Sequence, residues 1–230
     1  MSLQSKTLCA VAAVSVFVWL SAPAAAMDAP VLARPALLAN FAEEAASADV
    51  RYAAARVLAS ADNQGLPFVI VDKIDARIFV FEANGQLRGA SAALLGLASG
   101  DHSVPGIGQR ALSRILPEER TTPAGRFLSQ PGRNLQGEEV IWVNYHEGLA
   151  IHRLRPGNSQ EQRLQRLASS TPGDNRISLG CVVVPVAFYE SVVSPMLGKH
   201  HSVVYVLPET RPVQALFDGE PVGISQLSQP

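Results

Sequence analysis

Residues 67–97 read PFVIVDKIDARIFVFEANGQLRGASAALLGL, and this stretch decides the fold class. It opens with two runs of apolar, β-prone residues, Phe68–Val71 and Ala76–Phe81, which a short polar turn separates. Asn84-Gly85 then gives a strong hairpin signal, and Leu87–Leu97 is the expected returning strand. The stretch therefore predicts three adjacent antiparallel strands.

Strand patterns continue further along the chain. They cover four segments: Glu139–Tyr145, Leu149–Leu154, Val182–Val184 and Ser202–Leu207. Helices are expected over Gln160–Leu167 and after Pro185, which suits a first helical turn. Residues 99–138 are rich in Gly and Pro and predict a long excursion, a kind of loop that is often functional. Because hairpin-length connections join most strands, the predicted fold is mostly β, an antiparallel sandwich or barrel with minor helices.

The first 26 residues have the pattern of a secretory signal peptide. Lys6 precedes an apolar run from Leu8 to Leu20, and the small-residue exit Ser21–Ala26 follows. The alternative is a retained membrane anchor, but the run is shorter than the roughly 18–20 residues that span a bilayer. The mature chain is therefore expected to begin near Met27, to be periplasmic or associated with the cell wall, and to have no stable membrane insertion.

The mature chain divides into three parts. Residues 27–65 are Ala-rich with helical spacing, which predicts one or two amphipathic helices, although the composition also suits a loosely ordered lead segment. Residues 66–208 contain the strand patterns and form the predicted main domain. Residues 209–230 hold several prolines and are expected to be a C-terminal tail.

The composition excludes two classes of partner. A hydrophobic fraction of 47% suffices for a real core, while 19 basic and 20 acidic side chains leave a net charge of −1. The chain therefore has no basic footprint for nucleic acid and no polybasic patch for anionic lipid. The composition leaves the oligomeric state open.

Cysteine usage points to one residue. The chain has two cysteines, and Cys9 would leave with the signal peptide, so Cys181 has no disulfide partner in a compartment where disulfides form. A lone thiol there is either a nucleophile or a buried cysteine that behaves as a small hydrophobe. The neighbouring residues favour the nucleophile. Gly180 allows backbone and substrate to approach closely, and the amides around it are candidate oxyanion donors.

A thiol with a pKa of about 8.5 needs an activating neighbour. His152, in an apolar strand, is the first choice for the base, and His146, in the preceding turn, is the second. The alternative is that His152 is a core histidine held by ordinary hydrogen bonds. The histidines and cysteines show no metal-ligand spacing, so no metal and no organic cofactor is expected.

Two motifs together resemble the catalytic domain of the L,D-transpeptidase family. Ala150-Ile151-His152 followed by Ser178-Leu179-Gly180-Cys181 is similar to the family's histidine-bearing strand and its downstream Ser/Thr-x-Gly-Cys motif. The segment Thr122–Phe127 looks like the family's T-P-x-G-x-aromatic segment. The resemblance spans roughly Pro67 to Leu207 and implies a largely β catalytic domain that acts on peptidoglycan.

The resemblance also implies a role for each motif residue. Cys181 would attack the stem peptide, His152 would accept the thiol proton, and the backbone carbonyl of Arg153 would orient the histidine ring. Ser178 and Gly180 match the supporting positions of the motif. The implied product is a thioester on Cys181, which passes to an amine in a transpeptidase or to water in an L,D-carboxypeptidase. The acceptor is left open.

Arginines and aromatic residues near the motifs are candidates for substrate binding. Four arginines flank the motifs: Arg126, Arg153, Arg155 and Arg176. Because arginine binds carboxylates through two parallel hydrogen bonds, we expect Arg126, Arg153 and Arg176 to bind the carboxylates of peptidoglycan stems. The alternative is ordinary surface charge. Tyr145 and His146, directly before the histidine strand, are also expected to line the substrate site.

The sequence departs from the family pattern at three points. Leu179 stands where the family often has histidine, and Val183 stands where it commonly has Arg or Asn. The gap between His152 and Ser178 is longer than usual and predicts an inserted helix. Leu179 and Val183 favour a second hypothesis, a catalytically weak or inactive peptidoglycan-binding module of the same fold. A third, a cysteine peptidase of unrelated fold, is opposed by the predominance of strands.

Overall fold

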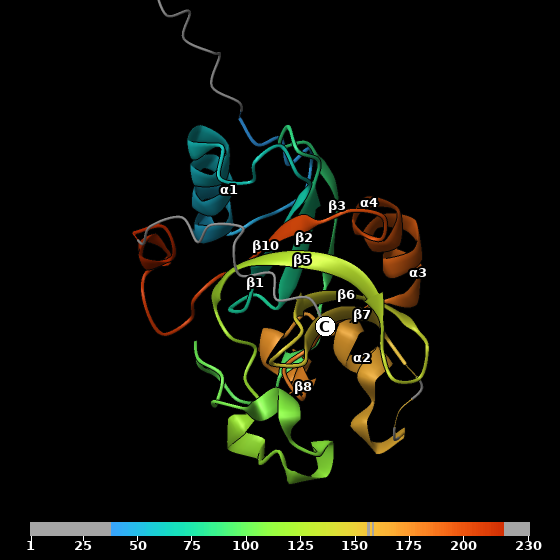
Figure 1. Cartoon of the computed structure of the whole chain (residues 1–230). Helices are drawn as coiled ribbons and strands as arrows, with labels where there is room; N and C mark the ends of the chain where they lie inside the picture. Colours follow the sequence, from blue (N-terminus) through green and yellow to red (C-terminus); the bar gives the residue numbers. More distant parts are fainter. Residues whose placement is uncertain (1–37, 156, 158, 219–230) are drawn as a thin grey trace, which may run out of the picture. The chain divides into compact units, whose positions relative to one another are not determined.

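A computed structural model describes residues 38–155, 157 and 159–218. The predicted signal peptide, the start of the lead segment and residues 219–230 lie outside the described residues. The described part is mostly β, as the sequence predicts (Figure 1). Its strands are β1 Phe68–Asp72, β2 Arg77–Phe81, β3 Leu87–Ala92, β4 Leu95–Gly96, β5 Gly125–Arg133, β6 Glu139–Asn144, β7 Leu149–Arg153, β8 Arg176–Ser178, β9 Val182–Val184 and β10 Ser202–Val206.

Helices are short and few in the described part. They are α1 Ala48–Ser60, α2 Arg163–Ala168, α3 Val186–Phe188 and α4 Ser194–Leu197, with a π-helix Tyr189–Val193 between the last two. Short 3-10 helices cover Ile107–Gln109, Leu112–Arg114, Pro117–Glu119, Ser159–Glu161, Pro172–Asn175 and Val213–Leu216. The helices expected over 160–167 and after Pro185 are therefore present, the first of them beginning at Arg163.

One eight-stranded sheet, in the order β3-β2-β1-β10-β5-β6-β7-β9, dominates the fold, and β4 pairs with β8 in a small second sheet. The predicted antiparallel trio β1-β2-β3 is confirmed, whereas the β1–β10 and β7–β9 pairs are parallel. Leu94, just after β3, donates to the Val183 carbonyl of β9 at 2.7 Å and accepts from the Val183 amide at 2.9 Å. These bonds bridge the two edges, so the sheet is nearly closed and barrel-like.

Two strand predictions need correction. The returning strand Leu87–Leu97 is broken into β3 and β4, because the chain leaves the edge of the large sheet at Leu94 to pair elsewhere. The predicted excursion 99–138 extends too far along the chain, because its residues Gly125–Arg133 form β5, which lies in the middle of the sheet between β10 and β6. Pro131 is a poor strand former, yet it pairs with Ile141 in register. Cross-strand contacts here override local preference.

The main hydrophobic core fills the inside of the barrel. Residues at alternate positions of six strands point into it, among them Val69, Ile151 and Val182, and Tyr189 and Leu197 from the helical region close it. A second core lies on the opposite face of β1, β2 and β10, where α1 packs. A third, smaller cluster joins Leu94, Leu154, Leu167 and Val183 outside β9.

The segments on either side of the main domain pack on the second core. Ser47 caps α1 by accepting from the Val50 amide at 3.2 Å and donates to Asp72 at 2.6 Å, which docks the helix on the end of β1. Within residues 38–65, the described part of the expected helical lead, the helix is α1. Residues beyond 208 were expected to form a tail, but Val213 is buried against the second core. Among the described residues, no helix combines the length and apolar character that a membrane span requires.

Candidate active site

The sheet places the predicted nucleophile and base on adjacent strands. His152 of β7 pairs with Val183 of β9 in parallel register, and Cys181 immediately precedes β9. Ile151 and Val182 point into the main core. Because side chains alternate between the two faces of a strand, His152 points to the opposite face. The position of Cys181 next to Val182 puts it on that same outer face.

The imidazole of His152 is held in one tautomer. Its Nδ1 lies 2.8 Å from the carbonyl oxygen of Arg153, the contact that the family resemblance implies. A carbonyl oxygen only accepts hydrogen bonds, so Nδ1 carries the proton and Nε2 keeps a lone pair. Burial, with smaller contributions from Arg155 and Arg163, lowers the pKa of His152 to about 4. The ring is therefore neutral near pH 7 and presents Nε2 as a base.

The thiol of Cys181 is half-buried and protonated at rest. Burial raises its pKa, against the opposing effects of a hydrogen bond from the Ala150 backbone and the charge of Arg155. The sulfur donates to the carbonyl oxygen of Gly148 at 3.4 Å. In the described part of the chain, the thiol and the His152 ring share no hydrogen bond. Transfer of the proton to Nε2 thus requires the thiol to turn away from Gly148.

Ser178 and Gly180 shape the turn that precedes Cys181. The Ser178 hydroxyl donates to the Cys181 carbonyl at 2.6 Å and accepts from the Gly180 amide at 3.1 Å. Gly180 has φ +134°, and a Cβ there would lie 2.9 Å from the carbonyl oxygen of Thr121. The Ser-x-Gly-Cys spacing is thus a structural requirement of this turn, and both predicted supporting residues lie beside Cys181.

Thr122 also contacts this turn, although the sequence analysis did not place it among the site residues. Its hydroxyl donates to the Gly180 carbonyl at 2.7 Å and accepts from the Gly96 amide at 2.8 Å. The side chain is fully buried. The signal was present in the sequence, because Thr122 opens the segment that resembles the family's T-P-x-G motif.

The turn between β6 and β7 forms one side of the site, because its Gly148 accepts from the thiol. Tyr145 is 52% exposed, and its ring packs edge-on to Trp142 at 5.0 Å. His146 is exposed beside it. Both predicted substrate-binding residues lie in the turn whose Gly148 contacts the thiol, and both are exposed.

The long excursion supports the same turn from outside. Gly108 approaches it so closely that a Cβ there would lie 2.2 Å from the carbonyl oxygen of His146. The hydroxyl of Ser103 donates to Glu147 at 3.0 Å. The excursion thus buttresses the wall of the site, a role that fits the functional loop expected from its length.

The three arginines predicted to bind substrate do not gather around Cys181. Arg126 binds Asp62 through Nε at 2.6 Å, beyond the end of α1. The side chain of Arg176 is 14% exposed and is paired with Glu209. Arg153 follows His152 in β7, so its side chain leaves the strand on the opposite face, and its carbonyl oxygen contacts the His152 ring. The ion pairs of Arg126 and Arg176 are made with acidic residues that are far away in the sequence, so the sequence alone does not predict them.

Arg155 is the arginine whose charge acts on both Cys181 and His152, whereas Arg163 acts on His152. Arg155 lowers the pKa of both Cys181 and His152. Its Nε lies 2.6 Å from a carboxylate oxygen of Glu138. Arg155 is one of the four arginines that flank the motifs, but substrate binding was predicted only for the other three. Its position three residues after His152 was the feature of the sequence that could have indicated its proximity to the site.

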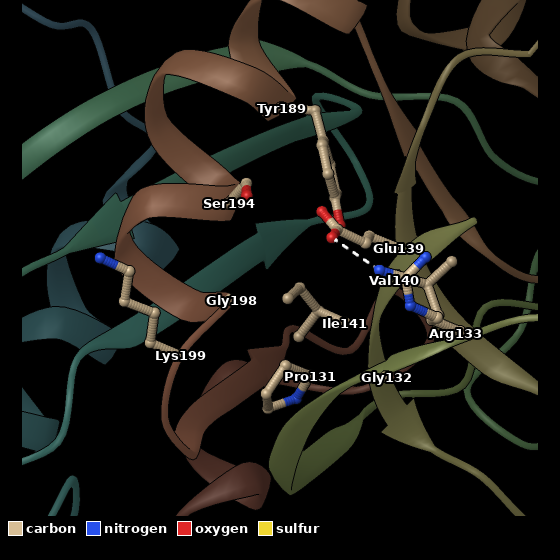
Figure 2. Close-up of a pocket in the computed structure, with 10 residues that line it drawn as sticks. All are labelled: Pro131, Gly132, Arg133, Glu139, Val140, Ile141, Tyr189, Ser194, Gly198 and Lys199. Atoms are coloured by element: carbon tan, nitrogen blue, oxygen red, sulfur yellow. Dashed lines mark hydrogen bonds and ion pairs between the residues drawn. The ribbon is translucent and has the colours of Figure 1, made fainter. Parts of the chain in front are cut away.

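A separate pocket lies on another part of the fold (Figure 2). It has a volume of about 410 Å³, and β5, β6 and the helical region around α4 line it. Arg133 and Glu139 face each other across 3.3 Å at one side, and burial raises the pKa of Tyr189 to about 12. None of the predicted catalytic residues lines this pocket.

Comparisons with known proteins give matches among solved structures. No protein-family model matches the chain, and no curated protein matches it. The structure of the Ldtfm–avibactam carbamoyl enzyme is 15% identical with a TM-score of 0.36, and the match covers 62% of this chain and 49% of that one.

Two further matches are to L,D-transpeptidase structures from Enterococcus faecium. The crystal structure of a cysteine-to-serine mutant is 18% identical with a TM-score of 0.32, covering 61% of this chain and 49% of that one. The NMR structure of the catalytic domain is 16% identical with a TM-score of 0.34, covering 62% and 98%. The chain spans about half the length of the first two of these three proteins.

Proposed function

We propose that the protein is an exported, peptidoglycan-modifying cysteine acyltransferase of the L,D-transpeptidase type. The observation that carries the proposal is the tautomer of His152, whose Nδ1 is held by the Arg153 carbonyl at 2.8 Å. This contact leaves an unprotonated Nε2 on the strand next to Cys181. A neutral imidazole on the strand adjacent to a thiol supports nucleophilic cysteine catalysis, in which a base takes the thiol proton. The motif resemblance supplies the substrate class.

In the first half-reaction, His152 Nε2 takes the proton of Cys181 as the thiol turns from Gly148. The thiolate attacks the carbonyl carbon that joins the third, L-centred stem residue to the terminal D-residue. Because the Gly180 amide donates to Ser178, the backbone amide of Cys181 is the donor that receives the developing oxyanion. The C–N bond then breaks, and the imidazolium returns its proton to the leaving amine. D-alanine departs and the stem remains as a thioester on Cys181.

In the second half-reaction, an acceptor amine or water resolves the thioester. His152 takes a proton from the acceptor as it attacks, and the sulfur leaves and regains a proton from the imidazolium. An amine acceptor gives transpeptidation, and water gives L,D-carboxypeptidase activity. The same two side chains perform both halves of the reaction.

A second candidate is a wall-binding module with weak or no turnover. Two observations favour it: the thiol bonds to Gly148 rather than to His152, and Leu179 and Val183 are apolar. Val183, however, is 1% exposed and packs with Leu154 and Leu167. The segment inserted after His152 therefore covers Val183, which accounts for one departure from the family pattern without loss of catalysis.

Acyl-enzyme formation separates the two candidates. The purified protein is incubated with a tetrapeptide stem, and intact mass is measured. We expect an adduct of the tripeptide acyl group on the mature chain that is absent from Cys181→Ala and retained in the matched control Gly173→Ala. No adduct on the parent protein, or an equal adduct on Cys181→Ala, contradicts the enzyme. Co-sedimentation with insoluble peptidoglycan without an adduct favours the binding module.

A further inference from the structure

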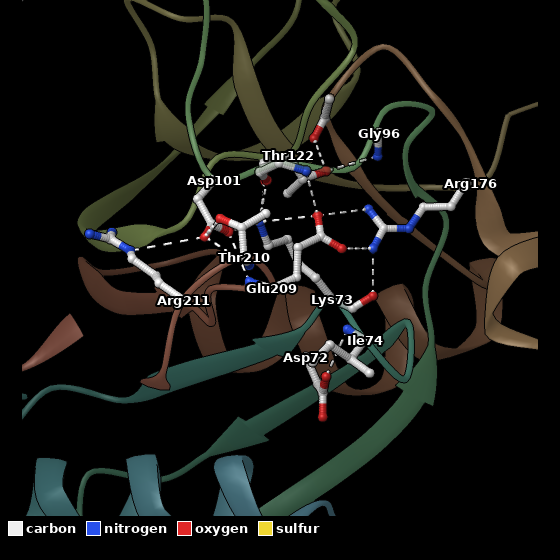
Figure 3. Close-up of polar contacts among 12 residues, drawn as sticks. Asp72, Lys73, Ile74, Gly96, Asp101, Thr122, Arg176, Glu209, Thr210 and Arg211 are labelled. Carbon is white, nitrogen blue, oxygen red and sulfur yellow. Dashed lines mark hydrogen bonds and ion pairs between the residues drawn. The ribbon is translucent and has the colours of Figure 1, made fainter. Parts of the chain in front are cut away.

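Four charged side chains meet in the interior behind the predicted site, and we name Lys73, Asp101, Arg176 and Glu209 the ionic cluster (Figure 3). Lys73 and Asp101 are 1% and 3% exposed. The Lys73 ammonium lies 2.8 Å from Asp101 and 3.4 Å from Glu209, and Arg176 pairs with Glu209. Arg211 adds a third cation at the edge of the cluster, 3.9 Å from Asp101, so three positive side chains surround the two carboxylates.

Such a cluster calls for an explanation beyond stability. Taking charges out of water is strongly unfavourable, and well-packed apolar residues often stabilise a fold as well as a buried ion pair does. The ionic cluster ties together the end of β1, the excursion, β8 and the segment after β10. Burial raises the pKa of Asp101, but hydrogen bonds from Lys73, from Thr210 and from the Glu209 amide outweigh it and hold this pKa well below its usual range. Asp101 is therefore charged near neutral pH, and its contacts fix these segments.

The ionic cluster reaches the predicted site through Thr122. The Lys73 ammonium donates to the backbone carbonyl of Thr122 at 3.1 Å. The Thr122 hydroxyl accepts from the Gly96 amide and therefore uses its single proton on the Gly180 carbonyl, at 2.7 Å. A continuous series of contacts thus links Lys73 to the residue before Cys181, and Figure 3 shows Thr122 between Lys73 and Gly96.

This contact fixes the direction of one amide. The peptide bond between Gly180 and Cys181 is trans, since no described peptide bond is cis. A trans peptide unit holds its C=O and N–H on opposite sides. Because Thr122 holds the carbonyl of Gly180 on one side, the N–H of Cys181 points away from Thr122. That N–H is one of the candidate oxyanion donors.

We propose that Thr122 is a positioning residue, whose hydroxyl, held in place by the ionic cluster, aims the Cys181 amide at the carbonyl oxygen of a bound acyl donor. The inference rests on the acyl-transfer chemistry of the proposed function but not on its peptidoglycan substrate. Thr122 does not touch the reacting atoms. Its effect is confined to the step in which an oxyanion forms.

Two reagents separate this role from general support of the site. Acylation of Cys181 by p-nitrophenyl acetate passes through a tetrahedral oxyanion, whereas alkylation by iodoacetamide does not. Both are measured on the mature chain, in which Cys181 is the single cysteine, with the modified residue identified by mass. We expect Thr122→Val to lower the acylation rate constant by about 10-fold or more, a part of the loss seen when an oxyanion donor is deleted. Alkylation stays within about twofold, and Thr122→Ser restores acylation.

Other outcomes overturn the proposal. The proposal is wrong if Thr122→Val is acylated as fast as the parent protein. It is also wrong if acylation and alkylation fall together, because Thr122 then supports the whole site. Finally, it is wrong if the parent protein is alkylated by iodoacetamide but not acylated by p-nitrophenyl acetate. If Thr122→Val does not fold, Glu209→Gln, which weakens the ionic cluster, must lower acylation selectively. A parent that is acylated by p-nitrophenyl acetate but not by a tetrapeptide stem contradicts the proposed substrate and leaves the role of Thr122 supported.

Discussion

The Nδ1 atom of His152 lies 2.8 Å from the carbonyl oxygen of Arg153. The acceptor is a backbone atom, so the orientation of the ring does not depend on the Arg153 side chain, which leaves the strand on the other face. Arg153→Ala should therefore keep the rate of Cys181 acylation within about twofold. His152→Gln should lower it by about 100-fold or more, the usual contribution of a general base.

The measurement is single-turnover acylation followed by intact mass, with circular dichroism to confirm that both variants fold. A large loss in Arg153→Ala would show that the guanidinium acts in the site, contrary to its position. Parent-like acylation by His152→Gln would remove His152 from the mechanism.

Burial of His152 makes stability depend on pH. The pKa of the folded-state ring is about 4, against an ordinary value of 6.5. Between these values the unfolded chain binds a proton that the folded chain does not, so stability rises with pH. The contribution is present above about pH 6.5 and is lost as pH falls toward 4, with a magnitude on the order of 3 kcal/mol. Urea unfolding at pH 7, 5 and 4 measures it.

His152→Gln provides the control, because glutamine does not titrate. The loss of stability between pH 7 and pH 4 should be smaller in the variant by the amount assigned to His152. If parent and variant lose stability equally over this range, the ring is not held neutral by burial.

The sequence predicted the parts of the fold that local pattern controls. The apolar runs around Val69 and Val80 form the buried strands β1 and β2 as expected, and the His152 strand and its carbonyl contact were anticipated through the motif. β5 was missed because Pro131 and neighbouring glycines resemble a loop, while its strand character comes from pairing with β6 and β10. The secondary structure of this segment is therefore set by the strands that pair with it and not by its own residues.

The arginines show the same division between local and tertiary information. Arg126 and Arg176 were expected at the substrate, yet each is engaged by an acidic residue far away in the sequence, Asp62 and Glu209 respectively. No spacing rule pairs residues so distant. Thr122 was visible as part of a motif, but its role depends on Gly180 lying against it in space.

Arg155 should tune both members of the predicted pair. Its charge lowers the pKa of Cys181 and of His152, whereas Arg163 acts on His152 without a corresponding effect on Cys181. Arg155→Ala should therefore shift the pH profile of iodoacetamide alkylation to higher pH and raise the pKa of His152 in an NMR titration. The matched control Arg163→Ala should raise the pKa of His152 alone. Identical alkylation profiles for parent and Arg155→Ala would show that the guanidinium does not reach the thiol.

Gly180 should be the least replaceable residue of the motif apart from Cys181 and His152. Its φ of +134° disfavours any side chain, and a Cβ would meet the Thr121 carbonyl oxygen at 2.9 Å. Gly180→Ala should cost about 1–3 kcal/mol in the free energy of unfolding. Gly173→Ala, where a Cβ meets nothing within 4 Å, should change stability by less than about 0.5 kcal/mol. Urea unfolding compares the two directly.

The same pair of variants also tests the geometry before Cys181. Relief of the clash in Gly180→Ala moves the Gly180 carbonyl from Thr122 and turns the Cys181 amide with it. Acylation by p-nitrophenyl acetate should therefore fall in Gly180→Ala even under conditions where the variant is fully folded, while Gly173→Ala acylates like the parent. A stable Gly180→Ala variant with parent-like acylation would mean that the turn tolerates a side chain and that the conformation of Gly180 does not control the amide.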